Sequence, residues 1–147
     1  MYLQLAKHRF IETERLLLRP ITLDDAPDMY EYASNEENVR LVFSRHNSIE
    51  ETEFLIANLF MKNPLGHYAV ELKEEKKMIG TADIRPDERS RSVEIAYALN
   101  QKYWGLGYAT EIARKLVYIS EAHLNAVRIW AMHDIEKPAS GHVLLKA

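Results

Sequence analysis

Ten residues between a strand pattern and a helix pattern have the composition of an anion-binding turn. They read Gln101-Lys102-Tyr103-Trp104-Gly105-Leu106-Gly107-Tyr108-Ala109-Thr110. Two glycines allow positive φ angles and a close approach of the backbone. Successive N–H groups at a helix start, with the positive end of the helix dipole behind them, bind phosphate groups. The turn therefore predicts a pyrophosphate site, although Gly105 and Gly107 fit equally a tight turn that holds no ligand.

Two other phosphate-binding motifs do not match this turn. A dinucleotide fingerprint needs a small third residue three positions after the second glycine, where this chain has Thr110, and a parallel βαβ unit around it. A P-loop needs Gly-Lys-Ser/Thr, whereas Gly107 is followed by Tyr108. Both motifs are therefore excluded.

The elements around the turn follow from the hydrophobic pattern. Strict alternation over Val93–Leu99 predicts a strand before the turn, and helical spacing from Leu106 to Ala122 predicts a long helix after it. Further strands are expected at 15–19, 68–73, 78–84 and 127–133, and further helices from Thr22, from Ser48 and from Pro138 into Leu144 and Leu145. The order of strand, two helices, three strands, helix, strand and helix predicts an α+β (mixed α/β) fold.

Two capping patterns mark the early helices. Thr22 with acids in the next turn, and Ser48 with Glu51, are typical helix starts. The apolar stripe of the second helix is expected to be Phe54, Leu55, Leu59 and Phe60, with Thr52 and Glu53 as polar residues between turns.

The glycine turn and the strands before it resemble one enzyme family. Lys102–Glu111 is similar to the acetyl-CoA loop of the GNAT superfamily of N-acetyltransferases, whose pattern is Gln/Arg-x-x-Gly-x-Gly/Ala, with Lys102 at its first position. Thr13–Arg19 and Val93–Tyr97 resemble the opening and fourth strands of the branch that acetylates ribosomal-protein N-termini, the RimJ/RimL type. The resemblance covers Ile11 to Ala147. It implies one N-acetyltransferase domain over residues 1–147, with three layers and a mostly antiparallel sheet splayed between its fourth and fifth strands.

The resemblance also implies where acetyl-CoA binds as co-substrate. It would lie between the splayed strands, 93–99 and 127–133, and the amine would attack the thioester directly. Backbone groups of Tyr97, Ala98 and Leu99 would hold the pantetheine arm. The amides of Tyr103, Trp104, Gly105, Leu106, Gly107, Tyr108, Ala109 and Thr110 would hold the pyrophosphate, and the Lys102 side chain would add charge.

Amine attack needs a base, because an ammonium group has no lone pair. Glu94 is the candidate, since it shares a face of the predicted strand with the small residues Ala96 and Ala98, where a substrate could approach. Burial of this carboxylate would favour proton uptake near neutral pH. The pattern alone favours an ordinary solvent-facing carboxylate, whereas the resemblance implies a base that acts directly or through water.

The leaving thiolate needs a proton or a hydrogen bond. The resemblance places Leu144 where many relatives have a tyrosine, so Ser140 is the candidate acid. An ordinary place in the first turn of the last helix is the equal alternative for Ser140. The histidines show no His-x-x-x-His spacing, so no metal site is expected.

Composition excludes several function classes. The chain has 147 residues, of which 47% are hydrophobic and 28% charged, as in one globular domain. The net charge of -3 lacks the basic surface of a nucleic-acid binder. The absence of cysteine excludes disulfides and thiolate nucleophiles. No apolar run reaches the ~20 residues of a membrane span, and residues 1–10 do not resemble a secretory signal. A cytoplasmic domain is expected.

The acceptor stays open between an N-terminal amine, of a ribosomal or other protein, and a small-molecule amine such as a polyamine or antibiotic. A CoA-binding module without turnover is the third possibility. Asp24, Asp25, Glu36 and Glu37 could attract a cationic acceptor. Because the family continues into further strands, the chain is expected to be truncated at its C-terminus. The strand 127–133 would then lack a partner on one side unless a homodimer covers it.

Overall fold

The computed structural model describes residues 1–35, 45–132 and 142–146. The helical elements are α1 (Tyr2–Lys7), the 3₁₀ turn η1 (Leu23–Asp25), α2 (Ala26–Ala33), α4 (Ile49–Leu55), the π-helical η2 (Ile56–Met61), the 3₁₀ turn η3 (Gln101–Tyr103) and α5 (Tyr108–Ala122). The strands are β1 (Ile11–Glu12), β2 (Leu16–Arg19), β3 (His67–Leu72), β4 (Lys77–Asp87), β5 (Ser92–Leu99), β6 (Arg128–Met132) and β7 (His142–Lys146). No described helix is long and apolar enough to cross a bilayer.

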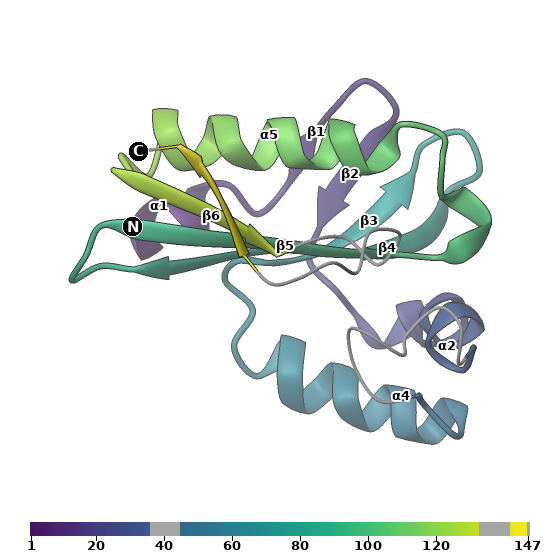
Figure 1. Cartoon of the computed structure of the whole chain (residues 1–147). Coiled ribbons are helices and arrows are strands. Elements are labelled where there is room, and N and C mark those ends of the chain that lie inside the picture. The colour runs from purple at the N-terminus through teal and green to yellow at the C-terminus, as the bar shows by residue number, and fades with distance from the viewer. Residues whose placement is uncertain (36–44, 133–141, 147) are drawn as a thin grey trace.

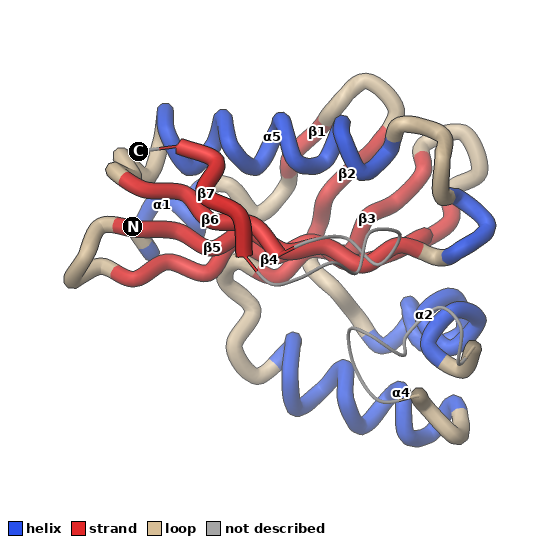
Figure 2. The backbone as a smooth tube through the Cα atoms, in the orientation of Figure 1, coloured by secondary structure: helices blue, strands red, loops and turns tan. Residues whose placement is uncertain are grey.

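The strands form one mixed sheet whose spatial order, β1 to β7, follows the chain (Figure 2). Every neighbouring pair is antiparallel except β5 and β6, which are parallel and joined through α5. A parallel pair needs such a long crossover, whereas the antiparallel pairs β3–β4 and β4–β5 close with short turns. The expected α+β fold with a mostly antiparallel sheet is confirmed.

Helices cover both faces of the sheet (Figure 1). On one face α5 inserts Ile112, Leu116 and Ile119 into a core that includes Ile95 from β5. On the other face α2 packs against the sheet around Tyr32, in a smaller core with residues of η2, β3 and β4. Three layers result, and the middle strand β4 contributes residues to both cores.

The pairing of β5 with its two neighbours differs in length. Toward β4 it runs the whole length of the strand, from Ser92 to Leu99. Toward β6, the pairing within the described residues covers 92–95, and its last pair is Ile95 opposite Ala131. The expected opening of the sheet between these two strands stays a prediction.

The C-terminal element differs from its prediction. A helix was expected to run into Leu144 and Leu145, but His142–Lys146 forms β7, antiparallel to β6. A short apolar run fits a strand as well as a helix, and the free edge of β6 offers backbone hydrogen bonds that favour the strand. Because β7 pairs with β6, the expectation that this strand lacks a partner on one side is also wrong. The prediction of a homodimer rested on an unpaired edge of β6, so the pairing with β7 removes its basis.

The stripe predicted for the second helix is wrong in detail. Phe54 and Leu59 are 64% and 55% exposed, whereas Thr52 is fully buried. The Thr52 hydroxyl donates to the Ser48 carbonyl and contacts the ring of buried His46, so its polar group is satisfied. From Ile56 the segment winds as a π-helix, and its wider turns change which residues face the sheet. The Ser48 cap is confirmed, because its hydroxyl accepts the Glu51 amide.

Candidate active site

The glycine turn ends in a left-handed residue that starts α5. Gly107 is the N-cap, with φ of 88°, and Gly105 has φ of 77°. L-residues rarely adopt these angles, so both positions favour glycine. The amides of Tyr103 and Trp104 already donate within η3, to Asn100 and Gln101. In the described part of the chain, the amides of residues 105–110 have no acceptor. The candidate donors to an anion therefore lie in the second half of the predicted loop.

The turn is attached to β5 by the side chain of Trp104. Its indole N–H donates to the Leu99 carbonyl at 3.0 Å. The Asn100 amide donates to Ile79 of β4 at 2.7 Å, so by strand alternation the backbone groups of Leu99 and Tyr97 face β6 and those of Ala98 face β4. The Leu99 carbonyl that faces this side is the one that accepts the Trp104 indole. Binding of a ligand by Tyr97, Ala98 and Leu99 stays a prediction, and the backbone groups of Ala98 point away from β6.

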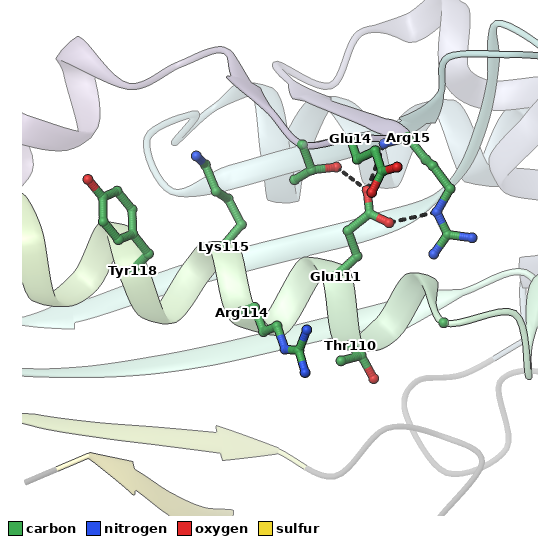
Figure 3. Close-up of a pocket in the computed structure, with 9 residues that line it drawn as sticks. Glu14, Arg15, Thr110, Glu111, Arg114, Lys115 and Tyr118 are labelled. Atoms are coloured by element: carbon green, nitrogen blue, oxygen red, sulfur yellow. Dashed lines mark hydrogen bonds and ion pairs between the residues drawn. The ribbon is translucent and has the colours of Figure 1, made fainter.

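On its other side the turn is held by Arg15, from the segment between β1 and β2 (Figure 3). The Arg15 Nη1 donates to the Leu106 carbonyl at 3.0 Å, and its guanidinium lies 4.2 Å from the centre of the Tyr108 ring. Arg15 Nε forms an ion pair with Glu111 Oε1 at 2.7 Å. The Arg15 amide and the Thr13 hydroxyl donate to the other oxygen of Glu111.

The cluster of Thr13, Arg15 and Glu111 determines the charge state of its own members. Burial alone would raise the pKa of Glu111, but the hydrogen bonds from Thr13 and Arg15 outweigh it and hold the pKa below its ordinary value. The hydrogen bond to Glu111 raises the pKa of Arg15. An open groove of about 570 Å³ lies over the cluster, with Arg114, Lys115 and Tyr118 as its further wall (Figure 3).

Lys102 is less free than the sequence suggested. Its side chain is 71% exposed, and its Nζ lies 3.7 Å from Glu31 on α2. Glu31 also binds Lys77 at 3.0 Å and the Asn100 side chain at 2.7 Å. Burial would raise the pKa of Glu31, but the hydrogen bonds from Lys77 and Asn100 hold it below its ordinary value. Glu31 thus offsets part of the charge that Lys102 was expected to contribute.

Glu94 lies on the sheet face opposite α5. Its cross-strand neighbour Arg85 donates to it at 3.2 Å and to Asp83 at 2.7 Å, and Asp83 contacts the His67 ring at 2.9 Å. The Glu94 side chain is 27% exposed, so the expected burial is not found, and a guanidinium is its neighbour. Ala96 and Ala98 share this face, as the alternation predicted, and both are buried.

Other candidate residues lie outside the described part of the chain or already have a partner. Ser140, the candidate acid, lies outside the described residues, as do Glu36 and Glu37. Asp25 is buried and paired with Arg19 at 2.8 Å, so it is not available to attract an acceptor. Among the described residues no cluster of three acidic or histidine side chains could hold a metal ion.

The described residues combine amides without an acceptor at a helix start, a strand that pairs in parallel with β6 over residues 92–95, and a carboxylate on that strand. Residues 15–147 match the family described as the acetyltransferase (GNAT) domain. The chain belongs to this GNAT acetyltransferase family. It is also 31% identical, over 92% of its length and 80% of the relative's, to the uncharacterised N-acetyltransferase YoaA of Bacillus subtilis (strain 168). The chain is therefore an acyltransferase of the N-acetyltransferase type.

Solved GNAT structures share this fold. A GNAT-family acetyltransferase from Bacillus anthracis superposes with a TM-score of 0.73 at 24% identity, over 83% of this chain and 72% of that one. A ribosomal-protein-S5-alanine acetyltransferase from Vibrio fischeri gives 0.62 at 21% identity, over 83% and 72%. Mutant forms of the spermidine/spermine N-acetyltransferase SpeG from Vibrio cholerae give 0.61 at 20%, over 86% and 74%. The shared fold therefore does not select the acceptor.

Sequence reasoning missed the contacts that hold the turn. Thr13, Arg15 and Glu111 each lie in a segment quoted for the family resemblance, yet nothing in their spacing predicts that they meet. The ion pair between Arg15 and Glu111, 96 positions apart, could not be predicted because each residue also has charged neighbours in the sequence. The acid in the first turn of α5, next to an expected phosphate site, was the one available signal, since it calls for a neutralising cation.

Proposed function

We propose that this enzyme transfers the acetyl group of acetyl-CoA to the α-amine of a protein N-terminus, as in the RimJ/RimL-type branch. The observation that carries the proposal is the start of α5. There the amides of residues 105–110 have no acceptor among the described residues and lie beside the tail of β5. Amides at a helix start bind pyrophosphate without a charged side chain.

The residues present fit acetyl-CoA, which supplies an activated thioester. The amides from Gly105 to Thr110 would bind its pyrophosphate, and the β6-facing backbone groups of Tyr97 and Leu99 would orient its pantetheine arm. Lys102 contributes a secondary, partly neutralised charge, because Glu31 lies beside it. Gly107 keeps the approach open, since a side chain there would meet Arg15.

Glu94 is the proposed base. It takes the proton of the acceptor ammonium, directly or through water, so that the amine can attack. Arg85, held between Glu94 and Asp83, fixes the direction of the Glu94 carboxylate. The Glu94 side chain is 27% exposed, so its carboxylate is accessible from the face opposite α5. Ser140 remains the proposed donor to the leaving thiolate.

The α-amine is proposed over small amines because of the motifs at 13–19 and 102–111, which are similar to those of the ribosomal-protein branch. A polyamine acceptor would call for several accessible carboxylates near the attack site. Beside Glu94 in the described part of this face, Asp83 is only 11% exposed and is paired with Arg85, so it adds no accessible carboxylate.

Cofactor binding is tested first, by thermal unfolding with acetyl-CoA, ATP or NAD. Acetyl-CoA should raise the melting temperature, whereas ATP and NAD should not. Equal stabilisation by ATP and acetyl-CoA would contradict the cofactor assignment.

The acceptor is tested by thioester consumption with matched amines. A short peptide with a free α-amine should be acetylated, whereas the same peptide with a blocked α-amine and a free lysine should not. Faster turnover with spermidine would assign the chain to small-molecule acetylation. Acetyl-CoA binding without consumption with any amine would indicate a CoA-binding module.

A further inference from the structure

We propose that Arg15 is a positioning residue for the cofactor turn, and that it acts by neutralising Glu111. This inference rests on the proposed function, because it concerns how the start of α5 binds the pyrophosphate of CoA. Arg15 lies in the β1–β2 segment, remote in sequence from the turn, and touches no atom expected to react.

Arg15 contacts the turn at consecutive positions. Its Nη1 donates to the Leu106 carbonyl at 3.0 Å, its Nη2 lies 3.2 Å from where a Cβ on Gly107 would be, and its guanidinium covers the Tyr108 ring at 4.2 Å. Figure 3 shows the Arg15 and Glu111 side chains turned toward each other across the start of α5. A planar guanidinium with several donors can make these contacts at once, whereas an ammonium cannot.

Glu111 carries a negative charge in the first turn of α5, beside the amides proposed to bind phosphate. A carboxylate in the first turn stabilises a helix through its dipole, but it also repels an anion that binds the same helix start. Glu111 is only 15% exposed, so solvent screens its charge incompletely. Arg15 Nε lies 2.7 Å from Glu111 Oε1, and the Arg15 amide donates to Glu111 Oε2 at 2.8 Å. With Arg15 in place, the amides of residues 105–110 act on phosphate without an opposing net charge.

This role predicts an asymmetry between the two halves of one ion pair. Arg15→Met leaves the Glu111 charge uncompensated, and should weaken CoA binding roughly tenfold, as expected for one charge at a helix end. Glu111→Gln removes the negative charge but keeps the side-chain shape, and should bind CoA at least as tightly as wild type. A purely structural pair would weaken binding in both variants alike.

The experiment is calorimetric titration of the full chain with CoA, for wild type and the variants R15M, E111Q and the double variant R15M/E111Q. Arg89→Met is the control, because it removes one positive charge from the β4–β5 turn, at the opposite end of β5. R15M should bind weakly, the double variant should recover most of the affinity, and R89M should match wild type. With acetyl-CoA varied at a saturating amine concentration, R15M should raise the KM for acetyl-CoA while kcat stays within about twofold, since Arg15 touches no reacting group.

The outcomes separate this inference from the proposed function. If wild type does not bind CoA, the proposed function fails and this inference with it. If wild type binds and R15M binds equally well, only the positioning role is refuted. Equal loss of affinity in R15M and E111Q would also refute it. If R15M does not fold, E111Q still decides, because weaker CoA binding than wild type would contradict the proposal.

Discussion

The two glycines of the cofactor turn should respond very differently to the addition of one methyl group. Both have positive φ, 77° for Gly105 and 88° for Gly107, so alanine at either position costs about 1–2 kcal/mol of backbone strain. A Cβ on Gly105 would meet nothing within 4 Å, whereas a Cβ on Gly107 would lie 3.2 Å from Arg15 Nη2. Gly107→Ala must therefore also shift the end of the Arg15 side chain by a few tenths of an ångström, which strains its contacts with Leu106 and Tyr108.

The expected destabilisation is about 1–2 kcal/mol for Gly105→Ala, and about 1 kcal/mol more for Gly107→Ala because of the strained Arg15 contact. In a domain of this size each kcal/mol lowers the melting temperature by about 2–4 °C. Thermal unfolding of the two variants should thus differ by several degrees, and CoA titration should show the larger loss of affinity in Gly107→Ala. An equal or larger effect of Gly105→Ala on both measurements would refute the reasoning, because it would mean that Arg15 does not pack against the turn.

Three further predictions concern the base, the acid dependence and a helix cap. Glu94→Gln should lower turnover by roughly 10²–10⁴ while CoA affinity measured by titration stays unchanged, and a normal rate at pH 7 would remove Glu94 from the mechanism. The hydrogen bonds from Thr13 and Arg15 lower the pKa of Glu111 below its ordinary value of 4.5. The stability that this pairing contributes is therefore fully present above about pH 4.5, and it is lost as the pH falls through the lowered pKa. Acid unfolding of Glu111→Gln should lack this pH-dependent contribution. Ser48→Ala should cost about 1 kcal/mol in denaturant unfolding, and no change would show that the cap is dispensable.

The parts of the fold set by local pattern were predictable from the sequence. Strict alternation gave β5 nearly to the residue, and the helical spacing after the glycines gave α5, which begins at Tyr108 rather than Leu106. The position of the turn between them follows from the same patterns.

The parts that depend on distant partners were not predictable. His142–Lys146 is a strand because β6 offers it an edge, which its own residues do not reveal. Thr52 is buried because its hydroxyl donates to the Ser48 carbonyl and contacts the ring of His46, a partner that only the fold supplies. The short strand β1 and helix α1 carry too few residues for a periodic signal.

Some residues of the candidate site were predictable from the sequence, and their partners were not. The glycines, Glu94 and the β5 tail were named from spacing and resemblance, and the structure brings the turn and the β5 tail together through Trp104. The partners of these groups came only from the fold. Arg15 reaches the turn from the first strands, Glu31 reaches Lys102 from α2, and Arg85 meets Glu94 across the β4–β5 pair.

The central claim is acetyl transfer from acetyl-CoA to an α-amine, and mass spectrometry of the acceptor tests it most directly. The purified chain is incubated with acetyl-CoA and an equimolar mixture of a free N-terminal peptide, its α-blocked lysine counterpart and spermidine. We expect one added acetyl group on the α-amine of the free peptide and little product on the other two acceptors. Glu94→Gln should give little or no acetylated peptide. Acetylation of spermidine alone, or equal product from Glu94→Gln and wild type, would contradict it.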